Sequence, residues 1–170
     1  MRRLVSLVIV TLAVAASAGI VVARNDGLTP EQQAVKAATA RFHSVDQAVA
    51  AGYVAASPCE SSPFGTMGIH YLNGPLVGDP TVDPLRPEVL LYLPDEAGKL
   101  RLVGVEYFKV DADQNTATDG DRPSVLGQPM EGPMAGHAPG MPIHYDRHFW
   151  LYASNPDGLF ATWNRAISCP

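Results

Sequence analysis

Three of the five histidines and three of the five methionines in this 170-residue chain fall between Met130 and His148. The same stretch is rich in glycine and proline, so it is expected to present these side chains on a loop. Thioether sulfur and imidazole nitrogen suit copper, and imidazole also suits zinc. The clustering therefore predicts a transition-metal site, with copper as the first candidate and zinc as the second.

The end of this stretch runs into a segment, 143–153, whose β-branched and aromatic content predicts a strand. Side chains alternate between the faces of a strand, so His144, Asp146 and His148 share one face. On a straight strand His144 and His148 lie about 13 Å apart, because each residue advances about 3.3 Å. One ion therefore cannot bind both histidines unless the strand bends, whereas His144 and Asp146 are better spaced.

Two other expected strands carry a polar residue among apolar neighbours: His70 in 67–72 and Glu106 in 100–110. A carboxylate in such surroundings needs a partner or a raised pKa. If the strands are neighbours, His70, Glu106 and either His144 or His148 converge on one face, and such a set suits zinc, iron or copper. The candidate ligands are His70, Glu106, His144 and His148 from the strands, with His137, Met134 and Met141 from the loop.

Two other interpretations remain open. The same Glu and His side chains fit a metal-free enzyme or binding module for a small molecule, acting as acid–base groups under a lid formed by 111–142. Trp150, Phe160 and Trp163 would then line an apolar pocket, unless they belong to the core. In the third interpretation the histidines are structural, the methionines fill gaps beneath the loop, and the protein is an envelope component without a site.

Residues 1–23 are expected to be a signal peptide. Arg2 and Arg3 precede an apolar run, and Ala16-Ser17-Ala18 has the small-x-small pattern of a cleavage site. Because the run is about 20 residues long, an uncleaved N-terminal anchor is the alternative. Residues 24–170 are expected to form one exported domain, either secreted, periplasmic or held at the cell envelope.

Cys59 and Cys169 are the only cysteines in the chain. An oxidising compartment favours a disulfide between them, and they lack the close spacing of metal-binding knuckles. Without Arg2 and Arg3, ten basic side chains remain against seventeen acidic ones, a net charge of about −7. This charge disfavours nucleic acids and anionic membranes as partners and leaves a metal ion, a small molecule or another protein. The oligomeric state stays open.

The order of the expected elements predicts an α+β fold, in which an N-terminal helix pair packs on a small antiparallel sheet with long Pro/Gly-rich loops. Thr29-Pro30-Glu31 is typical of a helix start, and Ser44 with Gln47 has the capping-box pattern, so 30–51 should form two helices. Segments 75–87 and 111–142 should lack regular structure. The strands are expected at 67–72, 88–93, 100–110 and 143–153.

Several phrases together resemble a group of small exported bacterial proteins of unknown function. They are Ala-Gly-Tyr at 51–53, Met-Gly-Ile-His-Tyr at 67–71, Pro-Glu-Val-Leu-Leu-Tyr at 87–92, Val-Glu-Tyr-Phe at 105–108, and Trp-Asn…Ser-Cys at 163–169. The resemblance covers most of the chain after the apolar run. It implies export and a single domain, and it implies no activity and no site residues.

Overall fold

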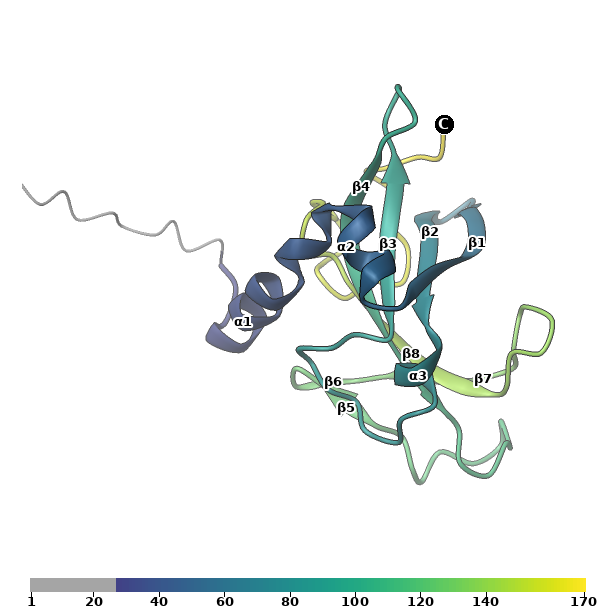
Figure 1. The fold of residues 1–170 in the computed structure, drawn as a ribbon. Coiled ribbons are helices and arrows are strands. Elements are labelled where there is room, and N and C mark those ends of the chain that lie inside the picture. The colour runs from purple at the N-terminus through teal and green to yellow at the C-terminus, as the bar shows by residue number, and fades with distance from the viewer. Residues whose placement is uncertain (1–26) are drawn as a thin grey trace, which may run out of the picture.

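A curled antiparallel sheet organises the protein, as seen in a computed structural model that describes residues 27–170 (Figure 1). The expected signal peptide at 1–23 lies outside the described residues. Six strands pair in the order β1-β2-β3-β4-β8-β7 and form a half-barrel, while β5 and β6 pair separately. The strands are β1 (Tyr53–Ser62), β2 (Gly65–Asn73), β3 (Val89–Pro94), β4 (Leu100–Val110), β5 (Ser124–Val125), β6 (Gln128–Pro129), β7 (Glu131–Met134) and β8 (His144–Phe149).

The helical segment comprises α1 (Pro30–Thr39), the 3-10 turn η1 (Ala40–His43) and α2 (Val45–Ala50). Thr29 caps α1 through a reciprocal pair of hydrogen bonds with Gln32, which satisfies two free N–H groups at the helix start. Ser44 precedes α2 as expected, but its side chain makes no capping hydrogen bond, so the expected capping box is absent there. None of the helices within residues 27–170 is long and apolar enough to cross a membrane.

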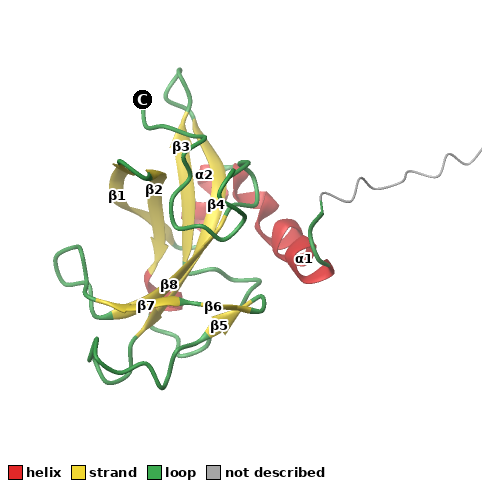
Figure 2. Ribbon diagram, turned by 180° about the vertical axis from the view of Figure 1, so that it is seen from behind, coloured by secondary structure: helices red, strands yellow, loops and turns green. Residues whose placement is uncertain are grey.

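The two faces of the sheet have different roles because neighbouring residues on a strand point to opposite sides. Tyr92 and Tyr107 belong to the larger buried cluster, which also takes in the helices. Leu91 and Phe108 belong to a second buried cluster on the other face. Figure 2, seen from behind, shows α2 beyond β3 and β4, with α1 to one side. The helix-covered face is therefore sealed by apolar packing, and Glu106 lies on the face away from the helices.

The α+β class, with helices against an antiparallel sheet, is confirmed, but several expected boundaries are wrong. Strand β1 was not expected, because Tyr53–Ser62 contains alanine, serine and proline and few β-branched residues. Proline is tolerated there because β1 is an edge strand with irregular register after Ala55. The expected strand 143–153 ends at Phe149, since Trp150 turns away to bond Leu159. The expected loops contain α3 (Gly74–Val77) and strands β5 to β7.

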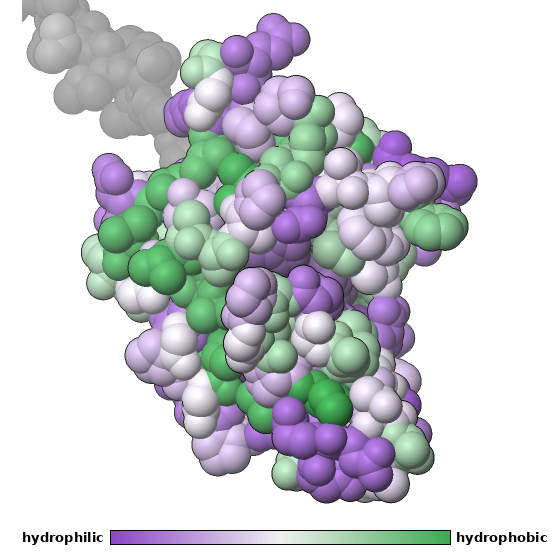
Figure 3. All heavy atoms as spheres, turned by 90° about the vertical axis from the view of Figure 1, so that its right-hand side faces the viewer, coloured by the Kyte–Doolittle hydropathy of each residue, from purple (hydrophilic) through white to green (hydrophobic). Residues whose placement is uncertain are grey.

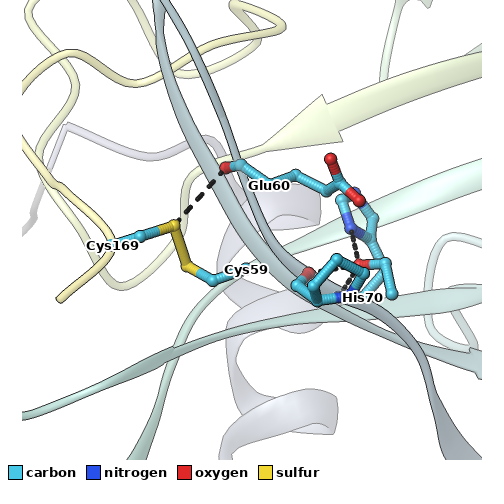
Figure 4. The surroundings of a disulfide bond; sticks show 6 residues. Cys59, Glu60, His70 and Cys169 are labelled. Atoms are coloured by element: carbon cyan, nitrogen blue, oxygen red, sulfur yellow. Dashed lines mark hydrogen bonds between the residues drawn. A yellow bond between two sulfur atoms is a disulfide. The ribbon is translucent and has the colours of Figure 1, made fainter.

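The C-terminal segment returns across the sheet and is fastened at two points. Thr66 on β2 exchanges two backbone hydrogen bonds with the fully buried Asn164. Further along, Cys169 forms a disulfide with Cys59 on β1, which confirms the expected bridge (Figure 4). The bridge is consistent with an oxidising compartment. It also holds the chain end beside the strand that carries Ser57 and Glu60.

Glu88, just before β3, gives the fold a pH-dependent stability. Its side chain is buried and accepts a hydrogen bond from the Phe108 N–H, and burial raises its pKa from 4.5 to about 7. The folded protein therefore holds this proton to a higher pH than the unfolded chain does, so stability falls as the pH rises from 4.5 to 7. The difference between the folded and unfolded pKa limits this loss in the free energy of unfolding to about 3 kcal/mol.

We therefore expect Glu88→Gln, whose amide oxygen still accepts from Phe108, to stabilise the protein at pH 8 by about 2 kcal/mol and to have little effect at pH 4.5. Urea unfolding of both proteins at the two pH values measures this difference. An equal effect at both pH values would contradict the assignment.

Candidate metal centre

A cavity of about 490 Å³ opens on the sheet face away from the helices, between strands β2, β4 and β8 and the loop after β7. Its size is within the range of small-ligand sites. Figure 3 shows a hollow on this side of the molecule with hydrophilic groups at its base. Four of the five histidines line the cavity, together with two buried carboxylates and three methionines: His70, His137, His144, His148, Glu106, Asp146, Met67, Met134 and Met141.

Strand register brings three of these side chains together. Glu106 on β4 stands directly opposite His148 on β8. His70 comes from β2, on the far side of β3, where it pairs with Leu91. Neighbouring strands lie about 4.8 Å apart, so His70 and Glu106 are separated by two strand spacings and meet only because both side chains are long. The resulting group of His70, Glu106 and His148 places one possible ligand atom of each residue within 4.8 Å of the others.

The distances within this inner group leave Glu106 between two imidazoles. Glu106 Oε2 lies 3.4 Å from His70 Nε2 and 3.9 Å from His148 Nε2. Burial lowers the pKa of His70 to about 4 and that of His148 to about 3, so both rings are neutral at pH 7. Burial, and next the neighbouring Asp146, raises the pKa of Glu106 well above its usual value. Without a cation the carboxyl group is thus expected to retain a proton.

Ser57 determines which nitrogen of His70 faces Glu106. The Ser57 hydroxyl donates to the Pro58 carbonyl at 2.7 Å and accepts from the His70 backbone N–H at 3.1 Å. Its proton is therefore already used, so its contact of 3.0 Å with His70 Nδ1 requires that Nδ1 carry the proton. In a neutral ring Nε2 is then bare, and its lone pair points toward the Glu106 carboxyl group.

His148 is the least satisfied side chain of the group. Only 2% of its surface is exposed, and neither ring nitrogen has a hydrogen-bond partner among the described residues. Glu106 Oε2 is likewise buried without a hydrogen bond of acceptable geometry in the part of the chain that is described. A buried polar atom without a partner costs about 1–3 kcal/mol, so the three unpartnered atoms of Glu106 and His148 need an explanation.

A second group forms at the outer part of the cavity from His137, His144 and Asp146, again within 4.8 Å of one another. His144 Nε2 lies 3.8 Å from Asp146 Oδ2, and the rings of His137 and His144 lie 5.4 Å apart. His144 and Asp146 are buried on β8, whereas His137 is exposed on the loop after β7. Burial raises the pKa of Asp146 to about 7 and lowers that of His144.

The predicted ligands therefore all line one cavity but divide into two groups, and His144 and His148 belong to different ones, as their spacing on the strand indicated. Met134 and Met141 also line the cavity, and the two groups themselves consist of histidines and carboxylates. Of the three aromatic residues suggested for an apolar pocket, only Trp163 lines it. Trp150 is buried in the second apolar cluster, and Phe160 stacks on Phe149 on the helix-covered side.

Two residues near the site were not found from the sequence. Ser57 and Glu60 line the cavity from β1, and Figure 4 shows the Glu60 side chain running toward His70. Because β1 itself was not expected, nothing in the sequence could place them beside His70. Asp146 was noted beside His144, and the structure gives it a position in the second group.

Comparison of the chain with protein-family models, with curated proteins and with solved structures finds no match.

Proposed function

We propose that this protein is exported and binds a copper or zinc ion through His70, Glu106 and His148, for metal handling or a metal-dependent reaction. Two imidazoles and one carboxylate from three different strands form a ligand set that suits either metal. The strands fix the backbone of each ligand, and Ser57 orients His70 in the way that second-shell partners orient metal-binding histidines. The disulfide Cys59–Cys169 supports a location outside the reducing cytoplasm.

The buried, unpartnered imidazole of His148 is the observation that carries the proposal. A histidine retained only for structure would be expected to hydrogen-bond at least one ring nitrogen. Here both nitrogens lack a partner within the described part of the chain, and Nε2 faces Glu106 and the bare nitrogen of His70. A cation bound between them would satisfy all three ligand atoms at once.

The three ligands leave part of the coordination sphere open toward the cavity. Structural zinc sites are usually closed by four protein ligands, whereas reactive sites keep a position for water or substrate. Here the open side faces a cavity with apolar walls that include Val89, Phe108 and Trp163. The arrangement therefore supports an ion that exchanges or reacts. Three methionines on the same walls favour copper over zinc if one of their sulfur atoms completes the site.

One feature supports the metal-free alternative. Burial raises the pKa of Glu106, and the neutral His70 adjoins it in the cavity, as in general acid–base pairs. This pairing needs no second histidine, so it leaves His148 unexplained. We therefore prefer the metal site.

Elemental analysis of the untagged protein, made in an oxidising compartment, tests the proposal. At least one equivalent of copper or zinc is expected, either as isolated or after loading and desalting, and the metal bound at His70, Glu106 and His148 should be lost in His70→Ala and His148→Ala. His43→Ala is the matched control, because His43 is exposed and its ring meets Tyr152 edge-on outside the cavity. Failure of the wild type to retain either metal would overturn the proposal and leave the Glu106–His70 pair as the place to seek acid–base chemistry.

Replacement of Ser57 by alanine should weaken metal binding without removing a ligand. The variant loses the acceptor that keeps the His70 proton on Nδ1, so Nε2 is free of its proton only part of the time. Loss of such second-shell partners typically lowers metal affinity 10–100-fold, and we expect about 10-fold here. Competition titration with a chromogenic chelator measures the change. Ser61→Ala, at an exposed position of the same strand, should bind like the wild type.

A further inference from the structure

We infer that the cavity holds a second metal ion, bound by His137, His144 and Asp146, beside the ion at His70, Glu106 and His148. This inference rests on the proposed function, because it assigns a pair of ions to the same cavity. The described residues contain two separate groups of possible ligands, and neither shares a residue with the other.

The hydrogen bond of His144 shows that its outer nitrogen is available to a cation. His144 Nδ1 lies 3.0 Å from the Pro142 carbonyl oxygen, which can only accept, so Nδ1 carries the proton. When the ring is neutral, Nε2 therefore carries no proton. The lone pair on Nε2 therefore faces Asp146 Oδ2 at 3.8 Å. Two acceptors in this arrangement need a proton or a cation between them.

The unpartnered carboxylate oxygen of Asp146 is independent support for a cation at this position. Its side chain lines the cavity with only 4% of its surface exposed, and its Oδ1 has no hydrogen-bond partner in the described chain. The neighbouring Arg147 forms its ion pair with Glu131 Oε1, at 3.0 Å, and points to the opposite side of β8 from Asp146. A buried carboxylate of this kind is usually paired with a cation or coordinates a metal.

The two positions adjoin each other along β8. Asp146 and His148 are two residues apart on one face, about 6.6 Å between their Cα atoms. Glu106 stands directly opposite His148 and lines the same cavity as Asp146, so the two carboxylates face one space. Each position then holds one carboxylate beside two imidazoles, and two divalent ions offset the mutual repulsion of Glu106 and Asp146.

The two positions should differ in how easily they exchange metal. The inner ligands all come from strands of the sheet, whereas His137 comes from the loop between Met134 and His144. That loop is closed tightly on itself, since a Cβ atom at Gly136 would lie 2.0 Å from the Met141 carbonyl oxygen. The position of His137 therefore depends on this close approach, and Gly136→Ala should displace His137 without removing any ligand.

Titration of the metal-free full chain with Cu(II), and separately with Zn(II), tests the second ion by calorimetry and by elemental analysis after desalting. We expect two equivalents of bound metal in the wild type and in His43→Ala. One equivalent should remain at the inner site in His137→Ala and Gly136→Ala. In Glu106→Gln, one equivalent should remain at the site of His137, His144 and Asp146. Dipolar broadening of the Cu(II) electron paramagnetic resonance spectrum should appear only with two ions bound.

The outcomes separate the two proposals. One equivalent in the wild type would overturn the second ion and leave the inner site standing, whereas none in the wild type would overturn both. Two equivalents in His137→Ala, or none in that variant, would also overturn the second ion. His137 is exposed, so its replacement should not disturb folding.

Discussion

Glu106→Gln should bind copper or zinc at the inner site, formed by His70, Glu106 and His148, at least about 100-fold more weakly than the wild type while folding as well or better. Glutamine has the same shape as the protonated carboxyl group that the metal-free protein is expected to hold, so the apoprotein loses no charge interaction. It cannot supply the anionic oxygen that the ion needs at the inner site. Loss of outer-shell partners alone costs 10–100-fold in affinity, so loss of the anionic ligand should exceed that range.

Competition with a chelator of known affinity measures the change, and thermal unfolding of the metal-free proteins checks the fold. Glu88→Gln is the matched control, because Glu88 is also a buried glutamate with a raised pKa but lies outside the cavity. It should bind metal like the wild type. Unchanged affinity in Glu106→Gln, or an equal loss in Glu88→Gln, would contradict the assignment of Glu106 as a ligand.

Helical spacing and cap residues were sufficient to predict the helices, and β-branched and aromatic content was sufficient to predict four strand segments. Alternation along each strand then predicted which polar residues share a face. Glu106 is predictable in this way, because it interrupts an apolar strand and its alternation with Tyr107 places it away from the helices. The rise per residue along a strand likewise separates His144 from His148, although both lie on one face. These features depend only on residues close together in the chain, so they can be predicted from a single sequence.

The pairing of distant strands could not be predicted in the same way. His70 reaches Glu106 only because β2 lies next to β3, which depends on contacts that no local pattern specifies. The edge strand β1 has too few β-branched residues to be recognised, and with it Ser57 and the tautomer of His70 were missed. The division of the ligands into two groups likewise follows from the position of the loop that carries His137.

Removal of the disulfide, by Cys59→Ser together with Cys169→Ser, should lower the free energy of unfolding by about 4–5 kcal/mol. The bridge closes a loop with a sequence separation of 110 residues, and in the chain-entropy model the loss of freedom in the unfolded chain grows with the length of that loop. Such a loss is comparable to the whole stability of many domains. Urea unfolding of the double variant and of the wild type measures it, and the reduced wild type should match the variant.

The same variant separates the stability of the fold from the integrity of the site. The C-terminal segment is also held by the paired backbone bonds of Thr66 and Asn164, and the Thr162 hydroxyl donates to Glu131 at 2.5 Å. These contacts should keep Thr162 and Trp163 against the cavity below the unfolding transition. Metal stoichiometry at low temperature should therefore match the wild type. A loss of metal with little loss of stability would contradict this, because it would mean that the bridge, rather than Asn164, holds the segment over the cavity.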